Sequence, residues 1–431
     1  MVVFKDLRLS VDARFVLQAL ICRESSSLLS ISFKVKAVAK QLCLTERLVR
    51  EGMQELADVG LLVSRRRADK VGRPVQEYES SQSLCDLVAL VGQGEAVHQD
   101  LIVRLFSEPE IYALGPFSAG VVGTCEEKGK PARKPTRKDG RPAAPGAKGR
   151  LAASTRVLLA ALLSFADQCG VATGVSETRL RAMTGLNALS LKHQVKRLIS
   201  LGFIRTHVPG VSSGIFVGAK VPTIYYLNLD HPQLRTARGE CGLVVHVALG
   251  PEKFDRLATG IPSAQTLKAL GPAALEMLYH KLAGHTSRLL SAVWAEPDEI
   301  QREVTAVVAA NIANELGDLW VGSPAKDKGY YWTGMQDNFH AAACEWADSL
   351  HKRLLRWNVW RGYRPQLVRL IPAPNRTDGL TISSLVVYPA PQSAVTCLVV
   401  WDKYDGRVDH YGREEELDLA LRCDAGLLTK D

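Results

Sequence analysis

Hydrophobic positions near the N-terminus recur every three or four residues, which is the spacing of one face of an α-helix. Residues 11–22 show this spacing first, and residues 35–42 repeat it over a shorter stretch. Thr45 then precedes a third apolar pattern, ERLVREGMQELADVG, and its hydroxyl is suited to cap the first turn. The pattern therefore predicts three helices in this part of the chain.

Gly60 stands where the third helix should end, because glycine readily adopts the left-handed conformation that follows many helices. Two short segments, LLVSRRR and PVQEYE, come next and are separated by ADKVGR. Their composition predicts two paired strands around a turn that holds Lys70 and Arg73. The expected order is helix, helix, helix, hairpin.

The same order occurs twice along the chain. Shifting the sequence by 142 positions aligns ARFVLQALICRES with TRVLLAALLSFAD, so that Arg14 meets Arg156. The register continues without a gap to Leu62, which meets Ile204. Chance rarely maintains one register over such a length, so we interpret the two segments as repeats of one supersecondary unit. Beyond this point RPVQEY faces VPTIYY, and the hairpin of the second repeat is longer.

This order resembles the winged helix-turn-helix of MarR-like bacterial regulators, here duplicated. The resemblance rests on VAKQLCLTERLVREGMQELADVGLL with GRPVQEY, and on LRAMTGLNALSLKHQVKRLISLGFI with PTIYY. It covers residues 8–80, called the first repeat below, and residues 152–230, called the second repeat. It implies winged-helix DNA-binding domains at 1–106 and 151–232, each with a third helix that enters the major groove.

Composition adds a linker and a third region. The formal net charge is +9, and the positive excess falls within the first 230 residues. Residues 107–150, which include KGKPARKPTRKDGRPAAPGAKGR, have little to bury and predict a flexible basic linker. This linker is either a solvated spacer or a segment that also follows DNA phosphates. All seven tryptophans lie in the C-terminal part of the chain, which indicates a different kind of domain there.

The third helix of the first repeat carries the residues expected to read bases. Arginine and glutamine can form paired hydrogen bonds with guanine and adenine edges. The expected positions on this helix are Thr45, Arg47, Arg50 and Gln54. Contacts to phosphate or the minor groove are expected from the hairpin residues Arg65, Arg66, Arg67, Lys70 and Arg73. The alternative is a solvated helix face on which glutamate and arginine pair locally.

The second repeat offers a more basic set at the equivalent positions. Its expected DNA-binding residues are Asn187, Lys192, His193 and Lys196. Leu189 replaces Arg47 and so removes one expected base contact. The longer wing, VPGVSSGIFVGAK, contains Val211, Ile215, Phe216 and Val217, and we expect its apolar tip to contact protein or to wedge into the minor groove.

Residues 240–431 show a different pattern. Helices are expected at 263–293, 297–320 and 336–357. The segments QLVRLIPA, LTISSLVVYPA and AVTCLVVWDKYDGRVDHYG then predict a small antiparallel sheet with a hairpin turn at Asp405–Gly406, and a final helix follows Gly412. The expected fold class is α+β: two tandem winged-helix domains, a basic flexible linker, and a mixed α/β C-terminal domain that oligomerises, binds a partner protein or senses a ligand.

No catalytic motif stands out. The chain contains no GxxxxGK[ST] phosphate loop, no GxGxxG following a strand and no GxSxG turn. His340 and Cys344 share a helix face, but a metal site needs further converging ligands. The nine cysteines are scattered and contain no CxxC pair, which favours buried thiols in a reducing compartment. We expect no enzyme activity, cofactor or metal.

The leading hypothesis is a sequence-specific regulator of transcription that binds double-stranded DNA. The alternative is a plasmid or phage replication initiator or partition factor, because tandem winged helices are also similar to plasmid initiators. A scaffold that does not bind DNA is a third class. The charged N-terminus and the lack of 18 consecutive apolar residues predict a cytoplasmic protein with no membrane segment. The resemblance implies that the protein is bacterial and associated with the nucleoid.

Overall fold

The structure is a computed structural model. It describes residues 8–24, 32–67, 75–91, 96–109, 111–113, 149–216, 218, 220–234, 241–247, 271–294, 298–316, 328–356, 365–371, 382–389, 397–401 and 407–428. Across these residues the fold is mixed α+β, with twelve α-helices and four small sheets. None of the described helices is long and apolar enough to cross a membrane.

The order of elements in the first repeat matches the predicted one and adds a short strand after the first helix. The elements are α1 Val11–Glu24, β1 Ser32–Lys34, α2 Val35–Leu42, α3 Glu46–Asp58, β2 Leu62–Arg67 and β3 Val75–Ser80. The strands form one antiparallel sheet in the order β1-β3-β2. The predicted pairing of two strands after the third helix is confirmed, whereas the turn between them lies outside the described residues.

The second repeat has the same succession of elements. They are α7 Ala153–Leu163, β4 Val171–Val175, α8 Glu177–Thr184, α9 Ala188–Ser200, β5 Ile204–Val208, β6 Val211–Ser212, β7 Lys220–Val221 and β8 Thr223–Leu227. Its main sheet has the order β4-β8-β5, in which the third strand is again central. The extra length of the second hairpin forms the small β6-β7 ladder.

The chain divides into two compact units. Unit 1 contains Met1–Ala166, Glu177–Phe203 and His231–Leu234, and unit 2 contains Asp167–Ser176, Ile204–Asp230 and Arg235–Asp431. The helices of both repeats therefore belong to unit 1, while the strands of the second repeat belong to unit 2. These units cut across the predicted domain 151–232, and the predicted domain bounds remain a prediction.

The core of unit 1 is helical. Helix α1 contacts α3, α7 and α5, the last spanning Gln99–Ser107, and α7 in turn contacts α8 and α9. The rings of Phe15 and Phe106 lie 5.5 Å apart between α1 and α5. Neither α5 nor α4, which spans Gln82–Val91, is among the helices expected from the sequence. Both follow the first hairpin.

Backbone hydrogen bonds pair residues near the two ends of the predicted linker. Tyr112 forms an antiparallel bridge with Arg150, and Leu151 donates its amide hydrogen to the carbonyl of Ile111 at 2.8 Å. Residues 114–148 lie outside the described residues, so the predicted flexibility of this segment is not tested. The two points at which the segment joins the fold are therefore adjacent.

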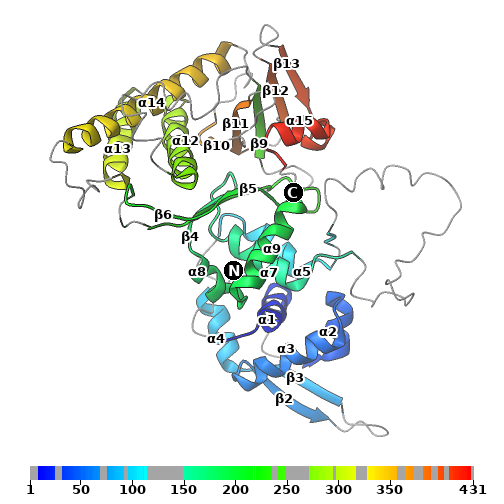
Figure 1. Cartoon of the computed structure of the whole chain (residues 1–431). Coiled ribbons are helices and arrows are strands. Elements are labelled where there is room, and N and C mark those ends of the chain that lie inside the picture. The colour runs from blue at the N-terminus through cyan, green and yellow to red at the C-terminus, as the bar shows by residue number, and fades with distance from the viewer. Residues whose placement is uncertain are drawn as a thin grey trace, which may run out of the picture. The chain divides into compact units, whose positions relative to one another are not determined.

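In unit 2, the helices α12, α13 and α14 contact one another beside a five-stranded sheet (Figure 1). Their bounds are Pro272–Trp294, Asp298–Glu315 and Lys328–Arg356. The sheet strands are β9 Cys241–Val247, β10 Arg369–Ile371, β11 Ile382–Pro389, β12 Cys397–Trp401 and β13 Arg407–Tyr411. A final helix, α15, spans Leu419–Asp424 and confirms the helix predicted after Gly412.

The prediction of an antiparallel C-terminal sheet was wrong. The order is β10-β11-β9-β12-β13, and β9 pairs parallel with β12 and antiparallel with β11. The sequence analysis did not identify β9, a short apolar run that precedes the three helices. Parallel neighbours need a long crossover connection, and the intervening helices occupy that connection.

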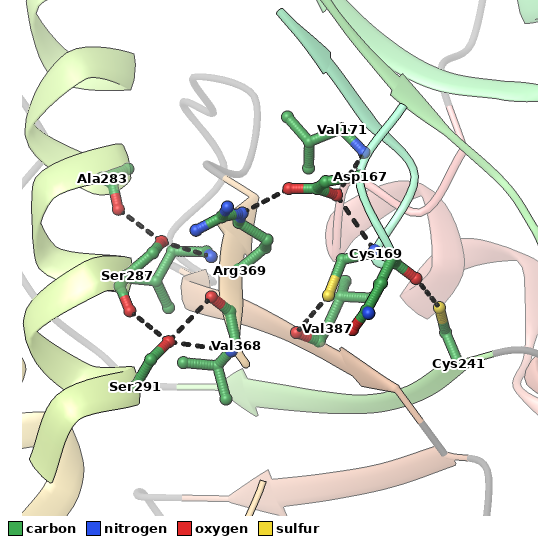
Figure 2. A network of polar contacts seen from close by, with 12 residues as sticks. Asp167, Cys169, Val171, Cys241, Ala283, Ser287, Ser291, Val368, Arg369 and Val387 are labelled. Carbon is green, nitrogen blue, oxygen red and sulfur yellow. Dashed lines mark hydrogen bonds and ion pairs between the residues drawn. The ribbon is translucent and has the colours of Figure 1, made fainter. Parts of the chain in front are cut away.

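Serine side chains on α12 cover the outer edge of β10 (Figure 2). The amide of Leu370 donates to Ser287 Oγ at 2.9 Å, and the amide of Val368 donates to Ser291 Oγ at 3.0 Å. Asp167 binds Arg369 at 2.6 Å and also accepts hydrogen bonds from the amides of Cys169 and Val171. The two serine bonds satisfy backbone amides at the edge of the sheet, where they would otherwise have no strand partner.

Candidate nucleic-acid interface

Helix α3 begins and ends as its sequence predicts. Thr45 Oγ1 accepts a hydrogen bond from the Leu48 amide at 3.3 Å, which confirms the predicted cap. Gly60 has a positive φ of 76°, which confirms its position after the helix end. One face of the helix buries Val49, Gly52, Met53 and Leu56, so the opposite face is left for polar residues.

The charged side chains on the exposed face of α3 pair with each other. Arg47 binds Glu51 at 2.8 Å, and Arg50 lies 3.9 Å from Glu46. Both arginines remain exposed, Arg47 at 84% of its side-chain surface. The local pairing that the sequence left open as an alternative is therefore present. Each carboxylate competes with any other acceptor for its arginine, although exposed ion pairs of this kind are weak.

Gln54 takes part in a network that joins α3 to the hairpin. Its amide nitrogen donates to Asp58 at 2.8 Å, and its carbonyl oxygen accepts from Gln76 and from the Tyr78 hydroxyl, both at 3.3 Å. Burial raises the pKa of Tyr78, which remains a hydrogen-bond donor at neutral pH. Both ends of the Gln54 amide are thus engaged within the protein, although base reading was the predicted role.

The hairpin residues have different surroundings. Arg65 binds Glu79 across the ladder at 3.2 Å, while Arg66 is exposed and lies opposite Gln76. Arg67 ends β2 opposite Val75, and nothing further is described of its side chain. Lys70 and Arg73 lie outside the described residues. Their predicted contacts with phosphate stay predictions.

Helix α9 is capped in the same way as α3. Asn187 Oδ1 accepts a hydrogen bond from the Ser190 amide at 2.8 Å, at the position equivalent to Thr45. Leu191, Val195, Leu198 and Ile199 are buried. Lys192, His193 and Lys196 are exposed, and none of the three makes a hydrogen bond or ion pair with another residue in the described part of the chain.

The two helices differ in charge at four positions, which are acidic in α3 and not in α9. Helix α3 carries Glu46, Glu51, Glu55 and Asp58. The equivalent residues of α9 are Ala188, His193, Arg197 and Ser200. Each carboxylate that could pair with a neighbouring cation is replaced, so the exposed face of α9 keeps its positive charge.

The expectation for the second wing was wrong for two of its apolar residues. Ile215 and Phe216 are only 4% and 1% exposed, and they cannot present an apolar tip to DNA or to another protein. Helix α12 contacts β6 of this wing within unit 2, so the longer hairpin packs inside its own chain. Val211 is partly exposed, and Val217 lies outside the described residues.

His340 and Cys344 lie one turn apart on α14. Cys344 Sγ lies 3.7 Å from His340 Nε2, as expected for one helix face. No group of three or more histidine, cysteine, aspartate or glutamate residues within the described ranges could hold a metal ion. His207 stacks on Tyr225, and burial lowers its pKa.

Comparison with known protein families, curated proteins and solved structures gives no match for this chain. The features that bear on function are therefore α3, α9 and the first hairpin. Sequence reasoning placed both helices and the cap Thr45, whereas it gave Asn187 only as a DNA-binding residue. It missed Gln76 and Tyr78 as partners of Gln54, and the only available signal was their position on the second strand of the hairpin.

Proposed function

We propose that this protein is a sequence-specific DNA-binding regulator of transcription with two winged helix-turn-helix units. The observation that carries the proposal is helix α9. It is capped by Asn187 and packed on one side, and its exposed side carries Lys192, His193 and Lys196 without any acidic residue on the helix. Two repeats with the same element order and the same strand order support it.

Electrostatics distinguish this surface from an ordinary solvated face. Lysines that have no carboxylate partner can neutralise phosphates and release the counterions condensed on DNA. Helix α3 occupies the position in the first repeat that α9 occupies in the second. Its carboxylates repel phosphate, and they compete with phosphate for Arg47 and Arg50. We therefore propose that α9 supplies most of the salt-dependent affinity and that α3 contributes after its ion pairs open.

The direct test is selection of bound sequences from random DNA duplexes, followed by titration of the best site at several salt concentrations. The double variant Lys192→Ala/Lys196→Ala should weaken binding to all sequences. The slope of log affinity against log salt should fall by about 0.9 for each lost phosphate contact. The matched control is Arg302→Ala/Lys352→Ala, which removes two exposed cations from α13 and α14.

Genome-wide mapping of bound sites tests the regulatory role. Sites at many promoters support regulation, whereas a single iterated array beside a replication origin would replace regulation with initiation. A wild-type chain that retards no duplex at low salt would overturn both. Oligomerisation or partner binding through residues 240–431 remains a prediction, and titration of oligomeric state against protein concentration tests it.

A further inference from the structure

Leu189 is an unusually placed apolar side chain. It lies in the first turn of α9, two residues after the cap Asn187, and is 80% exposed. This is the highest exposure among the large hydrophobic side chains that the structure describes. A single exposed leucine needs no explanation by itself, so its position has to carry the argument.

The surroundings of Leu189 are cationic. The exposed residues on the following turns are Lys192, His193 and Lys196, and the position equivalent to Leu189 in the first repeat is held by Arg47. Arg47 is almost equally exposed and extends from the same turn of α3. The two repeats therefore present side chains of opposite chemistry at one matching position, a polar fork in α3 and an apolar group in α9.

Only one apolar group projects from the base edges into the major groove, the 5-methyl group of thymine. If Lys192 and Lys196 bind the phosphates, Leu189 is suited to contact that methyl group. An apolar side chain there also disfavours cytosine, because it leaves the amino group of cytosine without a hydrogen-bond acceptor. We propose that Leu189 is a specificity-determining residue that recognises thymine through its methyl group. This inference rests on the proposed function, because it needs α9 to lie in the major groove.

The test is a double-mutant cycle between protein and DNA. Each thymine of the selected site is replaced in turn by deoxyuridine, which removes only the methyl group, and binding is measured for the wild type and for Leu189→Ala. At one thymine, deoxyuridine should weaken wild-type binding about fourfold, as expected for loss of one buried methyl contact. Leu189→Ala should show no further loss at that position, so the two changes should be non-additive there.

The variant is expected to fold, because Leu189 contributes little to the core and alanine favours helix. Equal thermal midpoints for the variant and the wild type check this. Leu189→Met serves as a second variant that keeps an apolar side chain and should retain most of the coupling. If no thymine shows coupling to Leu189 while the wild type still binds its selected site, this inference is wrong and the proposed function stands.

Two other results have distinct meanings. A wild type that binds no duplex overturns the proposed function together with this inference. A change in oligomeric state on Leu189→Ala, with unchanged discrimination between thymine and deoxyuridine, would show that Leu189 contacts a second copy of the chain, and this too overturns the inference.

Discussion

Arg14 and Arg156 occupy equivalent positions in the two repeats and make the same hydrogen bond. Arg14 Nε donates to the carbonyl of Leu9 at 3.1 Å, and Arg156 Nε donates to the carbonyl of Leu151 at 3.2 Å. Each acceptor lies five residues before its arginine. Both side chains are buried, at 7% and 4% exposure.

Each of these arginines also donates hydrogen bonds to carbonyl groups outside its own repeat. Arg14 donates to the carbonyl of Met183, which lies in α8 of the second repeat, at 3.3 Å. Arg156 donates to the carbonyl oxygens that follow α5, including that of Glu108 at 2.7 Å and that of Pro109 at 3.0 Å. Arg14 therefore joins the first repeat to the second, while Arg156 joins the second repeat to the segment that follows α5. Helices α1 and α7 also contact each other directly.

The residue that follows the second helix has the same left-handed backbone conformation in both repeats. Cys43 has a φ of 52° and Gly185 has a φ of 74°, and these positions align in the repeat. A Cβ atom at Gly185 would lie 2.7 Å from the carbonyl oxygen of Leu9, so only glycine fits there. Cys43 adopts the same conformation with a side chain, which is uncommon for a residue other than glycine.

We expect Arg156→Ala to lower the free energy of unfolding by about 3 kcal/mol or more, because several buried carbonyl groups lose their donor. Burial lowers the pKa of Arg156 to about 10, so the side chain remains charged at neutral pH. Chemical denaturation measures the change. Arg181→Ala, an exposed arginine of α8, is the control and should stay within about 0.5 kcal/mol of the wild type. Equal losses for the two variants would contradict the prediction.

The Gln54 network predicts a role in positioning the hairpin. Gln54→Ala and Tyr78→Phe should each lower stability by about 1 kcal/mol, because each removes a shared hydrogen bond. Their effects should not add, since Tyr78 donates to Gln54. Denaturation of the two single variants and the double variant tests this. If Gln54→Ala instead relaxes preference at one base pair and leaves stability unchanged, the base-reading role predicted from the sequence is correct.

Deleting residues 116–146 should leave the thermal midpoint nearly unchanged. The paired residues Ile111 and Leu151 hold the two ends of the segment together, and loop-closure entropy depends only weakly on length. If the segment contacts phosphates, the deletion should also flatten the salt dependence of DNA binding. A variant that replaces the lysines and arginines of 128–141 with glutamine separates charge from length. A salt slope equal to that of the wild type would leave the segment a spacer.

Stability should fall at acid pH through Glu315. Burial opposes its ionisation, but the proximity of His285 Nε2 at 3.3 Å and of the Lys281 ammonium at 3.0 Å outweighs burial and lowers the pKa of Glu315 to about 2. The unfolded chain takes up this proton near pH 4.5. The contribution is therefore complete above pH 4.5 and is lost as the pH falls toward 2.

Denaturation of Glu315→Gln and the wild type between pH 7 and 2 measures this contribution. The difference in free energy of unfolding between the two should shrink as the pH falls through this window. Glu303→Gln, an exposed glutamate on the same helix, should show no such trend. A difference between Glu315→Gln and the wild type that is constant with pH would contradict the assignment.

The sequence by itself determined the local features of this protein. The limits of α2, the cap Thr45 and the repeat that pairs Arg14 with Arg156 follow from periodicity, capping chemistry and alignment of the chain with itself. These features depend on residues within a few turns of one another, so a linear pattern records them.

Only the tertiary structure decided which distant groups meet. It placed β9 beside β12, buried Phe216, and connected Gln54 to Tyr78. It also showed that the arginines of α3 are paired while the lysines of α9 have no partner among the described residues. Whether a side chain is buried, paired or exposed depends on its contacts with segments far away in sequence. The spacing of residues along the chain does not indicate which distant segments make those contacts.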